Sequence, residues 1–240
     1  MKEMMKSAVL KFLDRFFPKT WYRRTSFSQD GEDLVLFSFY EDQKGYKGFY
    51  IDVGAHNPFR FSNTAFFYRR GWSGINIEPT PDLIPAFHRH RRRDINLNIA
   101  ISNSNEHLTF YMFDEPALNS FDAQISEFRD QTTRYKIIDK VKVQTYKLAE
   151  VLDKNLEVNQ RIDFLTIDAE GFDFEILKSN NWDKYRPQYI LVEQEFDVDK
   201  IVQDKIFLFL RELEYVLVAR TMRTSIYQTA GATRPEPNAS

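Results

Sequence analysis

The sequence predicts a single α/β domain in which a mostly parallel β-sheet carries helices on both faces. From residue 48 onward, short apolar segments alternate with amphipathic ones, which is the pattern of strands joined by helices. The first of these apolar segments ends in a glycine turn at Gly54. The chain has 240 residues, of which 42% are hydrophobic, so it can bury one full core but is short for two ordinary domains.

The individual elements follow from the same pattern. Strands are expected at the apolar runs 49–53, 75–78, 95–101, 108–113, 141–144, 162–167 and 189–194. Helices are expected at 145–153, 172–178 and 198–213, and a further helix opens at Pro81 behind Thr80. Residues 215–227 fit a closing hairpin. Residues 116–135 form the least regular stretch, and we predict that they act as a lid or substrate loop.

The two ends of the chain differ from the predicted domain, which covers residues 25–228. Residues 229–240 are small, polar and proline-bearing, so they are expected to form a disordered tail. In residues 1–24, apolar side chains lie close to one helical stripe, with Lys and Arg between them. This segment is expected either to pack as a helix, against the domain or in a homodimer, or to lie on an anionic membrane surface.

Composition and charge exclude several classes of protein. The 33 Lys and Arg against 35 Asp and Glu give a formal charge of −2, whereas a general nucleic-acid binder is usually far more basic. The absence of cysteine excludes disulfides, zinc–thiolate sites and cysteine nucleophiles. No apolar run reaches about 18 residues, so no membrane-spanning helix is expected. We expect a cytoplasmic protein, free or held at the inner face of a membrane by residues 1–24.

Two strand ends predict an adenosine-containing cofactor. In an open parallel sheet, ligands bind beyond the carboxyl ends of the strands, where the strand order reverses. Gly54 follows the first strand, and Glu78 ends the second strand 24 residues later, where a carboxylate can bind a ribose diol. Gly54 is followed by Ala55 and His56 without a second or third glycine. This turn therefore lacks the glycines that a dinucleotide fold needs to bind a pyrophosphate. S-adenosylmethionine has the ribose and no phosphate.

At this point the sequence resembles the FkbM-type family of S-adenosylmethionine-dependent methyltransferases. The matching segments, in order, are 28–33 (SQDGED), 50–58 (YIDVGAHNP), 62–64 (SNT), 71–79 (GWSGINIEP), 98–102 (NIAIS) and 167–171 (IDAEG). The resemblance implies the class I methyltransferase Rossmann-like fold, with a mostly parallel seven-stranded sheet. It also implies O-methylation of a sugar hydroxyl, on a nucleotide sugar or a surface polysaccharide precursor.

The resemblance also implies roles for residues of the cofactor site. The backbone of Gly54 and Ala55 is expected against the amino-acid end of the cofactor, and Asp52 is expected to support the turn or the cofactor's ammonium. Glu78 is expected to bind the ribose hydroxyls. Asn98 and Ala100 are expected near the adenine. Ser28, Gln29 and Asp33 are expected to close over the methionine portion, or else to form an ordinary helix start with Ser28 as the cap.

Methyl transfer to a sugar hydroxyl requires help, because the hydroxyl is a weak nucleophile at neutral pH. His56, Asp168 and Glu170 are the candidate catalytic residues, and His56 is the favoured base because its unperturbed pKa lies near neutrality. Alternatively, Asp168, Glu193 and His56 converge on a divalent ion, Mg or Mn, that lowers the pKa of the hydroxyl.

Three further alternatives remain open in the sequence. The basic run 88–93 is either a solvated face or a clamp for an anionic acceptor such as a nucleotide diphosphate sugar. A nicotinamide-dependent oxidoreductase has a similar fold, but the missing glycines oppose it. The third alternative is a catalytically silent protein that binds the cofactor and acts as a scaffold in polysaccharide assembly.

Overall fold

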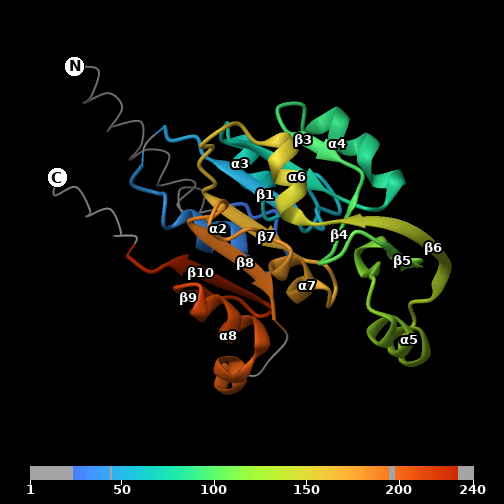
Figure 1. Cartoon of the computed structure of the whole chain (residues 1–240). Helices are drawn as coiled ribbons and strands as arrows, with labels where there is room; N and C mark the ends of the chain where they lie inside the picture. Colours follow the sequence, from blue (N-terminus) through green and yellow to red (C-terminus); the bar gives the residue numbers. More distant parts are fainter. Residues whose placement is uncertain (1–23, 44, 195–197, 232–240) are drawn as a thin grey trace, which may run out of the picture.

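The computed structural model of the chain describes residues 24–43, 45–194 and 198–231 (Figure 1). Within these residues, one large sheet contains seven strands. They are β1 (Phe49–Val53), β2 (Ser73–Ile77), β3 (Ile95–Leu97), β7 (Phe164–Ile167), β8 (Tyr189–Glu193), β9 (Tyr215–Arg220) and β10 (Thr224–Thr229). Their order in the sheet is β3-β2-β1-β7-β8-β10-β9.

The strand directions confirm the predicted α/β sheet. The five strands from β3 to β8 in the sheet order pair in parallel, whereas β10 is antiparallel to both β8 and β9. The expected closing hairpin at residues 215–227 is therefore present as β9 and β10. The strand order reverses between β1 and β7, so the ends of these two strands mark the place where a ligand cleft is expected to open.

Helices cover both faces of the large sheet. They are α2 (Glu32–Phe37), α3 (Ala65–Arg69), α4 (Ile84–His90), α6 (Leu148–Asn155), α7 (Asp173–Lys178) and α8 (Lys205–Glu212). Buried side chains of α6, α7 and α8 pack on one face with Ile51 and Val53 of β1. Side chains of α2 and α3 pack on the opposite face with Tyr50. Alternate residues of β1 thus point to opposite layers, and both layers are apolar because parallel strands are buried on both sides.

The layer under α2 and α3 is built mainly from aromatic rings. Trp72 contacts Tyr40 at 5.0 Å and Phe67 at 4.9 Å between ring centroids, and Phe67 contacts Phe164 of β7 at 4.8 Å. Tilted and edge-on pairs of this kind add stabilisation beyond the apolar area that they bury. Part of the high aromatic content of the sequence therefore lies in this layer of the core.

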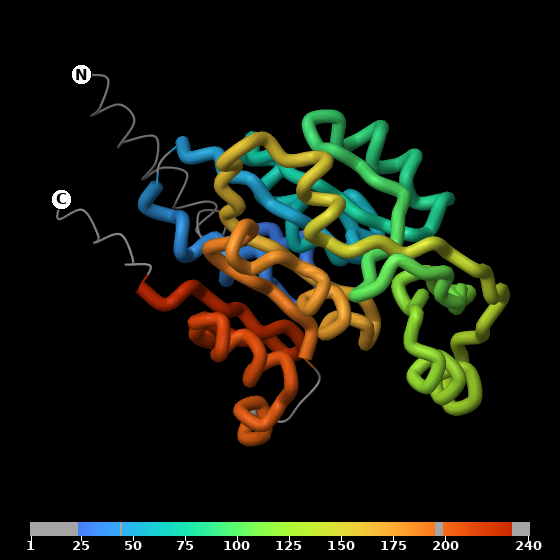
Figure 2. Tube along the Cα trace, in the orientation of Figure 1, coloured from blue at the N-terminus to red at the C-terminus, as the bar shows by residue number. Residues whose placement is uncertain are grey.

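A lobe formed by residues 100–146 stands beside one edge of the sheet (Figure 2). It contains β4 (Ala100–Ile101), β5 (His107–Phe113), η2 (Pro116–Leu118), α5 (Ala123–Thr132) and β6 (Ile137–Tyr146), and its sheet order is β4-β6-β5. The expected single strand at 95–101 is wrong, because β3 and β4 belong to different sheets. Residues 116–135 are also more regular than expected, because they include the ten-residue helix α5.

Two other expected helices begin later or are divided. The helix expected from residue 145 begins at Leu148, because β6 continues through Tyr146. The helix expected over 198–213 is divided into the 3-10 helix η3 (Val198–Gln203) and α8, because Asp204 caps α8 by accepting hydrogen bonds from the amides of Ile206 and Phe207.

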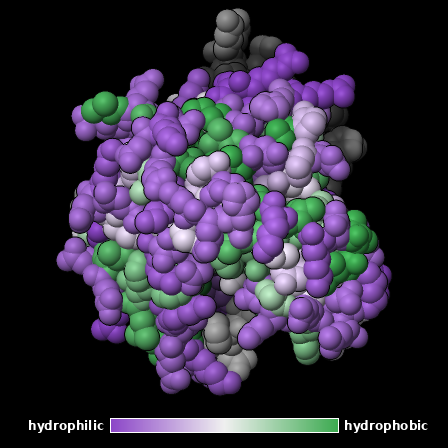
Figure 3. Space-filling view, turned by 45° about the vertical axis from the view of Figure 1, so that its right-hand side comes forward, coloured by the Kyte–Doolittle hydropathy of each residue, from purple (hydrophilic) through white to green (hydrophobic). Residues whose placement is uncertain are grey.

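The ends of the chain are only partly described. Thr229 is the last residue of β10, so the sheet continues one residue into the expected tail. The amphipathic segment at 1–24 and the remainder of the tail fall almost wholly outside the described residues. None of the helices in the described ranges is both long and apolar enough to span a bilayer. On the face drawn in Figure 3, hydrophobic residues reach the surface in separate patches between hydrophilic ones, which is ordinary for a protein surface.

Candidate functional site

The glycine turn after β1 brings two strand ends into contact. Gly54 has φ of 80°, a backbone conformation that residues with a side chain rarely adopt. A Cβ atom at this position would lie 1.8 Å from the backbone oxygen of Asp168, which follows β7. The amides of Gly54 and Ala55 both donate to the carbonyl of Ile77 in β2, at 3.0 and 3.1 Å. Only glycine therefore lets the ends of β1, β2 and β7 meet at this point.

Glu78, directly after β2, is held in a fixed orientation at this junction. Its side chain is only 5% exposed. The amide of His56 donates to Oε2 at 2.9 Å, and the amide of Thr80 donates to Oε1 at 2.8 Å. Burial raises the pKa of Glu78, whereas the hydrogen bonds from Thr80 and His56 act in the opposite direction. Two backbone amides thus fix both carboxylate oxygens at the edge of the cleft.

A mainly apolar pocket adjoins Glu78. The lobe and the segment that follows β7 supply most of its walls, and the apolar side chains that line it include those of Ile99, Ile101, Phe110, Phe121, Phe172 and Ile176. Its shape and lining suit a flat, weakly polar ring whose polar edge reaches the carboxylate.

Asn98 and Ala100, which were expected near the adenine of the cofactor, lie behind the pocket and do not line it. The Asn98 side chain donates to the carbonyls of Glu78 and Pro79, at 2.8 and 3.0 Å, and so braces the turn after β2. Ala100 is buried within β4. The lining residues are their neighbours Ile99 and Ile101, because alternate residues of extended backbone point to opposite sides.

A second, more polar compartment lies on the other side of Gly54. Its lining includes Gln29, Asp52, Ala55, His56 and Asp168. Asp52 accepts a hydrogen bond from Thr64 at 2.7 Å through Oδ2. Burial raises the pKa of Asp52 to about 6, although Thr64 and the charge of Arg91 oppose this shift. The sequence-predicted residues Gln29, Asp52, Gly54 and Ala55 are thus brought together here.

Asp33 does not reach this compartment. Its carboxylate accepts hydrogen bonds from the hydroxyls of Ser26 and Ser28 and from the amide of Phe27, at 2.6, 3.0 and 2.7 Å. Helix α2 begins at Glu32 behind Gly31, and no side chain caps it. Of the two roles considered for residues 28–33, Asp33 therefore has a structural one, and the expected cap by Ser28 is replaced by a turn built around Asp33.

His56 lies between the two compartments and lines both. Its Nε2 is 3.3 Å from the guanidinium of Arg60, which also binds both carboxylate oxygens of Glu115 in the lobe. Its Nδ1 is buried and has no hydrogen-bond partner among the described residues. Burial and the charge of Arg60 lower the pKa of His56, so the ring is neutral at pH 7.

Three carboxylates converge where the second compartment ends. Asp168, Glu170 and Glu193 each place an oxygen within 4.8 Å of the others. Enclosure by the protein, followed by the charges of Glu193 and Glu170, raises the pKa of Asp168 well above its usual range, even though its side chain is open to the cleft. The structure therefore brings Asp168 and Glu193 together, as expected, but the third side chain of this cluster is Glu170 and not His56.

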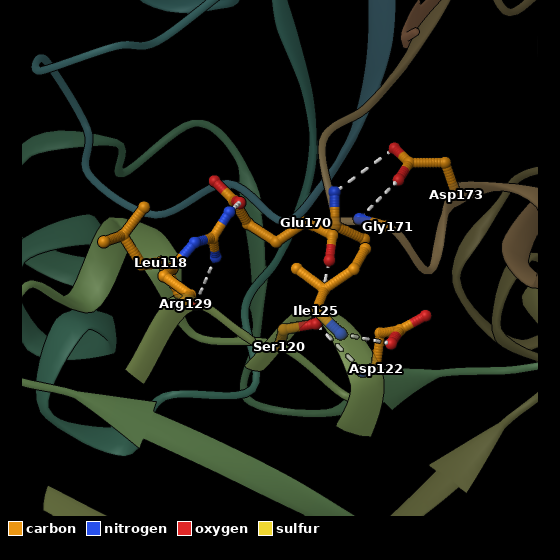
Figure 4. A network of polar contacts seen from close by, with 9 residues as sticks. Leu118, Ser120, Asp122, Ile125, Arg129, Glu170, Gly171 and Asp173 are labelled. Carbon is orange, nitrogen blue, oxygen red and sulfur yellow. Dashed lines mark hydrogen bonds and ion pairs between the residues drawn. The ribbon is translucent and has the colours of Figure 1, made fainter. Parts of the chain in front are cut away.

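The lobe fastens the loop that carries these carboxylates (Figure 4). Arg129 of α5 forms an ion pair with Glu170 at 2.7 Å, and the Ser120 hydroxyl donates to the Glu170 carbonyl at 2.8 Å. A Cβ atom on Gly171, whose φ is 96°, would lie 2.3 Å from the side chain of Ile125. On the other side, Asp173 accepts from the amides of Ala169 and Gly171, at 3.3 and 3.2 Å.

Sequence reasoning missed Arg129 and Asp173, although both hold the carboxylate loop in place. Arg129 belongs to a helix that was not predicted. Asp173 stands six residues after the end of β7, within the first turn of α7, and that position near a helix N-terminus was an available signal.

The basic run at 88–93 also differs from expectation. Most of its residues are exposed, but Arg91 is 0% exposed and faces the core beside Asp52. Arg91 is therefore not part of a solvated face, nor is it placed to clamp an acceptor.

The buried carboxylates predict how stability depends on pH. The pKa of Asp52 is raised to about 6 and that of Asp173 to about 7, mainly by burial. Between about pH 4 and 7 the folded chain therefore binds more protons than the unfolded chain, so stability rises as the pH falls from 8 to 6. His56 acts in the opposite direction, because its pKa is lowered in the folded chain, but it is one group against two. We expect a higher melting temperature at pH 6 than at pH 8, and a flatter pH dependence in Asp173→Asn. A lower melting temperature at pH 6 than at pH 8 would contradict the raised pKa values of Asp52 and Asp173.

Comparison with known proteins identifies the family. Residues 52–217 match the methyltransferase FkbM domain. A search of curated proteins finds no match. Among solved structures, methyltransferase FkbM from Methylobacillus flagellatus KT aligns with a TM-score of 0.47 and 11% identity, over 77% of this chain and 44% of that protein.

Two other solved structures are similar at the same level. The METTL16 methyltransferase domain aligns with a TM-score of 0.48 and 12% identity, over 82% of this chain and 65% of that one. The O-methyltransferase from Bacillus cereus in complex with SAH aligns with a TM-score of 0.40 and 10% identity, over 92% of this chain and 89% of that one. The chain spans less than two thirds of the length of the first two of these structures. The match to the FkbM domain covers most of this chain. The chain therefore belongs to the FkbM family of S-adenosylmethionine-dependent methyltransferases.

Proposed function

We propose that this protein transfers the methyl group of S-adenosylmethionine to a hydroxyl group of a sugar-containing acceptor. The observation that carries the proposal is that two adjoining pockets, which share Gly54, His56 and Asp168 in their linings, lie between the fixed carboxylate of Glu78 and the cluster of Asp168, Glu170 and Glu193. A site for an adenosine and a site for a reacting hydroxyl thus lie within the reach of one cofactor molecule.

The cofactor fits the cleft in one direction. Its adenine enters the apolar pocket between Ile99 and Phe121, and its ribose hydroxyls donate to Glu78. The amino-acid end then lies in the polar compartment beside Asp52 and Gln29. In this orientation the sulfonium methyl group points toward Asp168.

The reaction requires an acceptor for one proton. The acceptor oxygen attacks the methyl carbon, the bond between carbon and sulfur breaks, and S-adenosylhomocysteine leaves with the electron pair. The hydroxyl proton passes to a base. The structure supports Asp168 more strongly than His56, because a carboxylate with a raised pKa is a stronger base, whereas His56 faces Arg60 and has a lowered pKa.

The donor set also suits a divalent cation. Three carboxylates this close repel one another, and Arg129 forms an ion pair with Glu170. Asp168, Glu170 and Glu193 would hold Mg or Mn through oxygen ligands, the kind that these ions prefer. When bound, the ion would lower the pKa of the acceptor hydroxyl, and Asp168 would then orient the ion instead of taking the proton.

A third cleft adjoining the carboxylates supports a sugar-containing acceptor. It lies between the lobe and α8, and Glu170 and Glu193 contribute to its lining. It offers the exposed side-chain amide of Gln124 and the aromatic rings of Phe128 and Phe174. Amides that bind hydroxyl groups and rings that cover the apolar face of a pyranose are a suitable combination for such an acceptor.

Calorimetry followed by a transfer assay tests the proposal. We expect S-adenosylhomocysteine to bind and NAD not to bind, and methyl-labelled S-adenosylmethionine to label at least one member of a panel of nucleotide sugars and oligosaccharides. Binding of NAD instead would favour the oxidoreductase. Binding of S-adenosylhomocysteine with no transfer to any panel member is the result expected of the silent scaffold.

Glu78→Gln is expected to weaken the binding of S-adenosylhomocysteine by about 10- to 100-fold, because the ribose diol loses hydrogen bonds to a charged group. The variant keeps the size of the side chain, but its amide cannot accept from both backbone N–H groups, so thermal unfolding is measured alongside binding. Asp82→Asn removes an exposed carboxylate from the next turn and is the matched control. Equal affinity of Glu78→Gln and the wild type in calorimetry would disprove the placement of the ribose.

A further inference from the structure

A buried positive charge lies beside the polar compartment without a direct carboxylate partner. Arg91, the residue that ends α4, is 0% exposed. Within the described part of the chain, its four hydrogen bonds go to hydroxyl and carbonyl oxygens of Tyr50, Ser62 and Thr64. Burying a charge is costly unless other groups balance it, so the residues beyond these oxygens determine what Arg91 does.

Two hydroxyl groups connect Arg91 to two carboxylates. In one arm, Arg91 donates to Thr64 Oγ1 at 2.5 Å, and Thr64 Oγ1 donates to Asp52 Oδ2 at 2.7 Å. In the other arm, Arg91 donates to the Tyr50 hydroxyl at 3.4 Å, and this hydroxyl donates to Asp94 Oδ2 at 2.6 Å. Asp94 also accepts from Gly74 and Asn76 and stays within the sheet. Only the first arm leads to the cleft.

The first arm leaves one oxygen of Asp52 for a ligand. Oδ2 is taken by Thr64, and among the described residues no hydrogen bond reaches Oδ1. Asp52 lines the polar compartment, so Oδ1 faces the space where the amino-acid end of the cofactor lies in the proposed function. We propose that Arg91 is a positioning residue that acts through Thr64 to orient Asp52 and keep it ionised, so that Asp52 holds the α-ammonium group of S-adenosylmethionine.

The surrounding charges explain why such support is required. Burial is the main cause that raises the pKa of Asp52, and the negative charges of Asp94 and Glu78 raise it further. Asp168 also interacts with Asp52 across the cleft. Arg91 is the positive group that opposes them, together with the hydrogen bond from Thr64. Without the Thr64 hydroxyl, Asp52 would take up a proton closer to neutral pH, and the ammonium group would lose its charged partner.

Two ligands separate this role from a general effect on the site. S-adenosylhomocysteine carries the ammonium group, whereas 5′-methylthioadenosine has the same adenine and ribose and lacks the amino-acid end. Thr64→Val removes the hydroxyl without changing the size of the side chain. We expect this substitution to weaken the binding of S-adenosylhomocysteine by about 10- to 100-fold and to leave the binding of 5′-methylthioadenosine unchanged. Thr64→Ser restores the hydroxyl and is expected to restore the affinity.

Tyr50→Phe is the matched control, because it removes one buried hydroxyl from the other arm of the same network. It is expected to lower the melting temperature without changing the ratio of the two affinities. The loss of affinity for S-adenosylhomocysteine in Thr64→Val should also be larger at pH 6.5 than at pH 8. The reason is that the pKa of Asp52, about 6 in the wild type, rises in the variant.

The possible results are distinguishable. The inference is overturned if Thr64→Val weakens the binding of both ligands equally. It is also overturned if Tyr50→Phe changes the ratio of the two affinities as much as Thr64→Val does, because the network then only supports the fold. If neither ligand binds the wild-type protein, the proposed function itself fails. Selective loss of S-adenosylhomocysteine in Thr64→Val, with rescue by Thr64→Ser, supports the inference.

Discussion

Asp168→Asn is expected to leave the binding of S-adenosylhomocysteine unchanged and to lower the rate of methyl transfer by about 10²- to 10⁴-fold, the usual contribution of a positioned base. Asparagine has the same shape but neither takes up a proton nor carries a charge. Asp168 is the carboxylate of the cluster whose pKa the surroundings raise most clearly, and it lines both compartments of the cleft. Its loss therefore acts on the reacting atoms, whereas Glu78 still holds the ribose.

Three comparisons sharpen this prediction. His56→Ala is expected to lose less activity than Asp168→Asn, and Glu175→Gln, on the exposed side of α7 and paired with Lys178, is expected to lose none. If Asp168 is the base, a chelator has no effect. If a cation activates the hydroxyl, a chelator stops turnover, Mg or Mn restores it, and Glu193→Gln is as damaging as Asp168→Asn. Full activity of Asp168→Asn would show that the proton goes elsewhere.

Gly54→Ala is expected to abolish cofactor binding and to destabilise the fold by about 2–5 kcal/mol. Two costs combine here. A residue with a side chain is strained at a φ of 80°, and its Cβ would lie 1.8 Å from the backbone oxygen of Asp168. A backbone oxygen cannot turn aside as a flexible side chain can, so the ends of β1 and β7 must move apart. Thermal unfolding and calorimetry with S-adenosylhomocysteine measure the two effects.

Gly31→Ala isolates the first of these costs. Gly31 also has a positive φ, 88°, but nothing lies within 4 Å of the position that a Cβ atom would occupy. This variant is expected to lose only about 1 kcal/mol and to bind the cofactor normally. Equal effects of the two substitutions would mean that backbone strain, and not the contact with Asp168, explains the glycine at position 54.

The large sheet and the first half of the site were predictable because they depend on local signals. Apolar runs marked the parallel strands, which are buried on both faces. Gly54 and Glu78 follow two neighbouring strands, so their proximity follows from the strand order alone. The division of the expected helix at 198–213 also had a signal, since Asp204 is a favoured cap residue.

The lobe and the buried charges were not predictable in the same way. Among the residues of α5 only Ser126 is buried, so this helix has no apolar stripe to reveal it. The placement of Asn98 and Ala100 missed the pocket lining by one residue, because a break in the strand at this point separates β3 from β4. Arg91 stands among exposed arginines and histidines, and only the tertiary structure shows which member of the run turns inward.

The loop at 168–171 has a consequence for the order in which ligands interact. Gly54 touches it from the cofactor side, whereas Ile125 and Arg129 touch it from the side of the acceptor cleft. A ligand that shifts the loop from one side therefore alters the surface offered to the other. Any resulting coupling must be reciprocal, because the change that the cofactor makes in acceptor affinity equals the change that the acceptor makes in cofactor affinity. We expect the two substrates to bind cooperatively, and shortening Ile125 to alanine to weaken that cooperativity from outside the cofactor site.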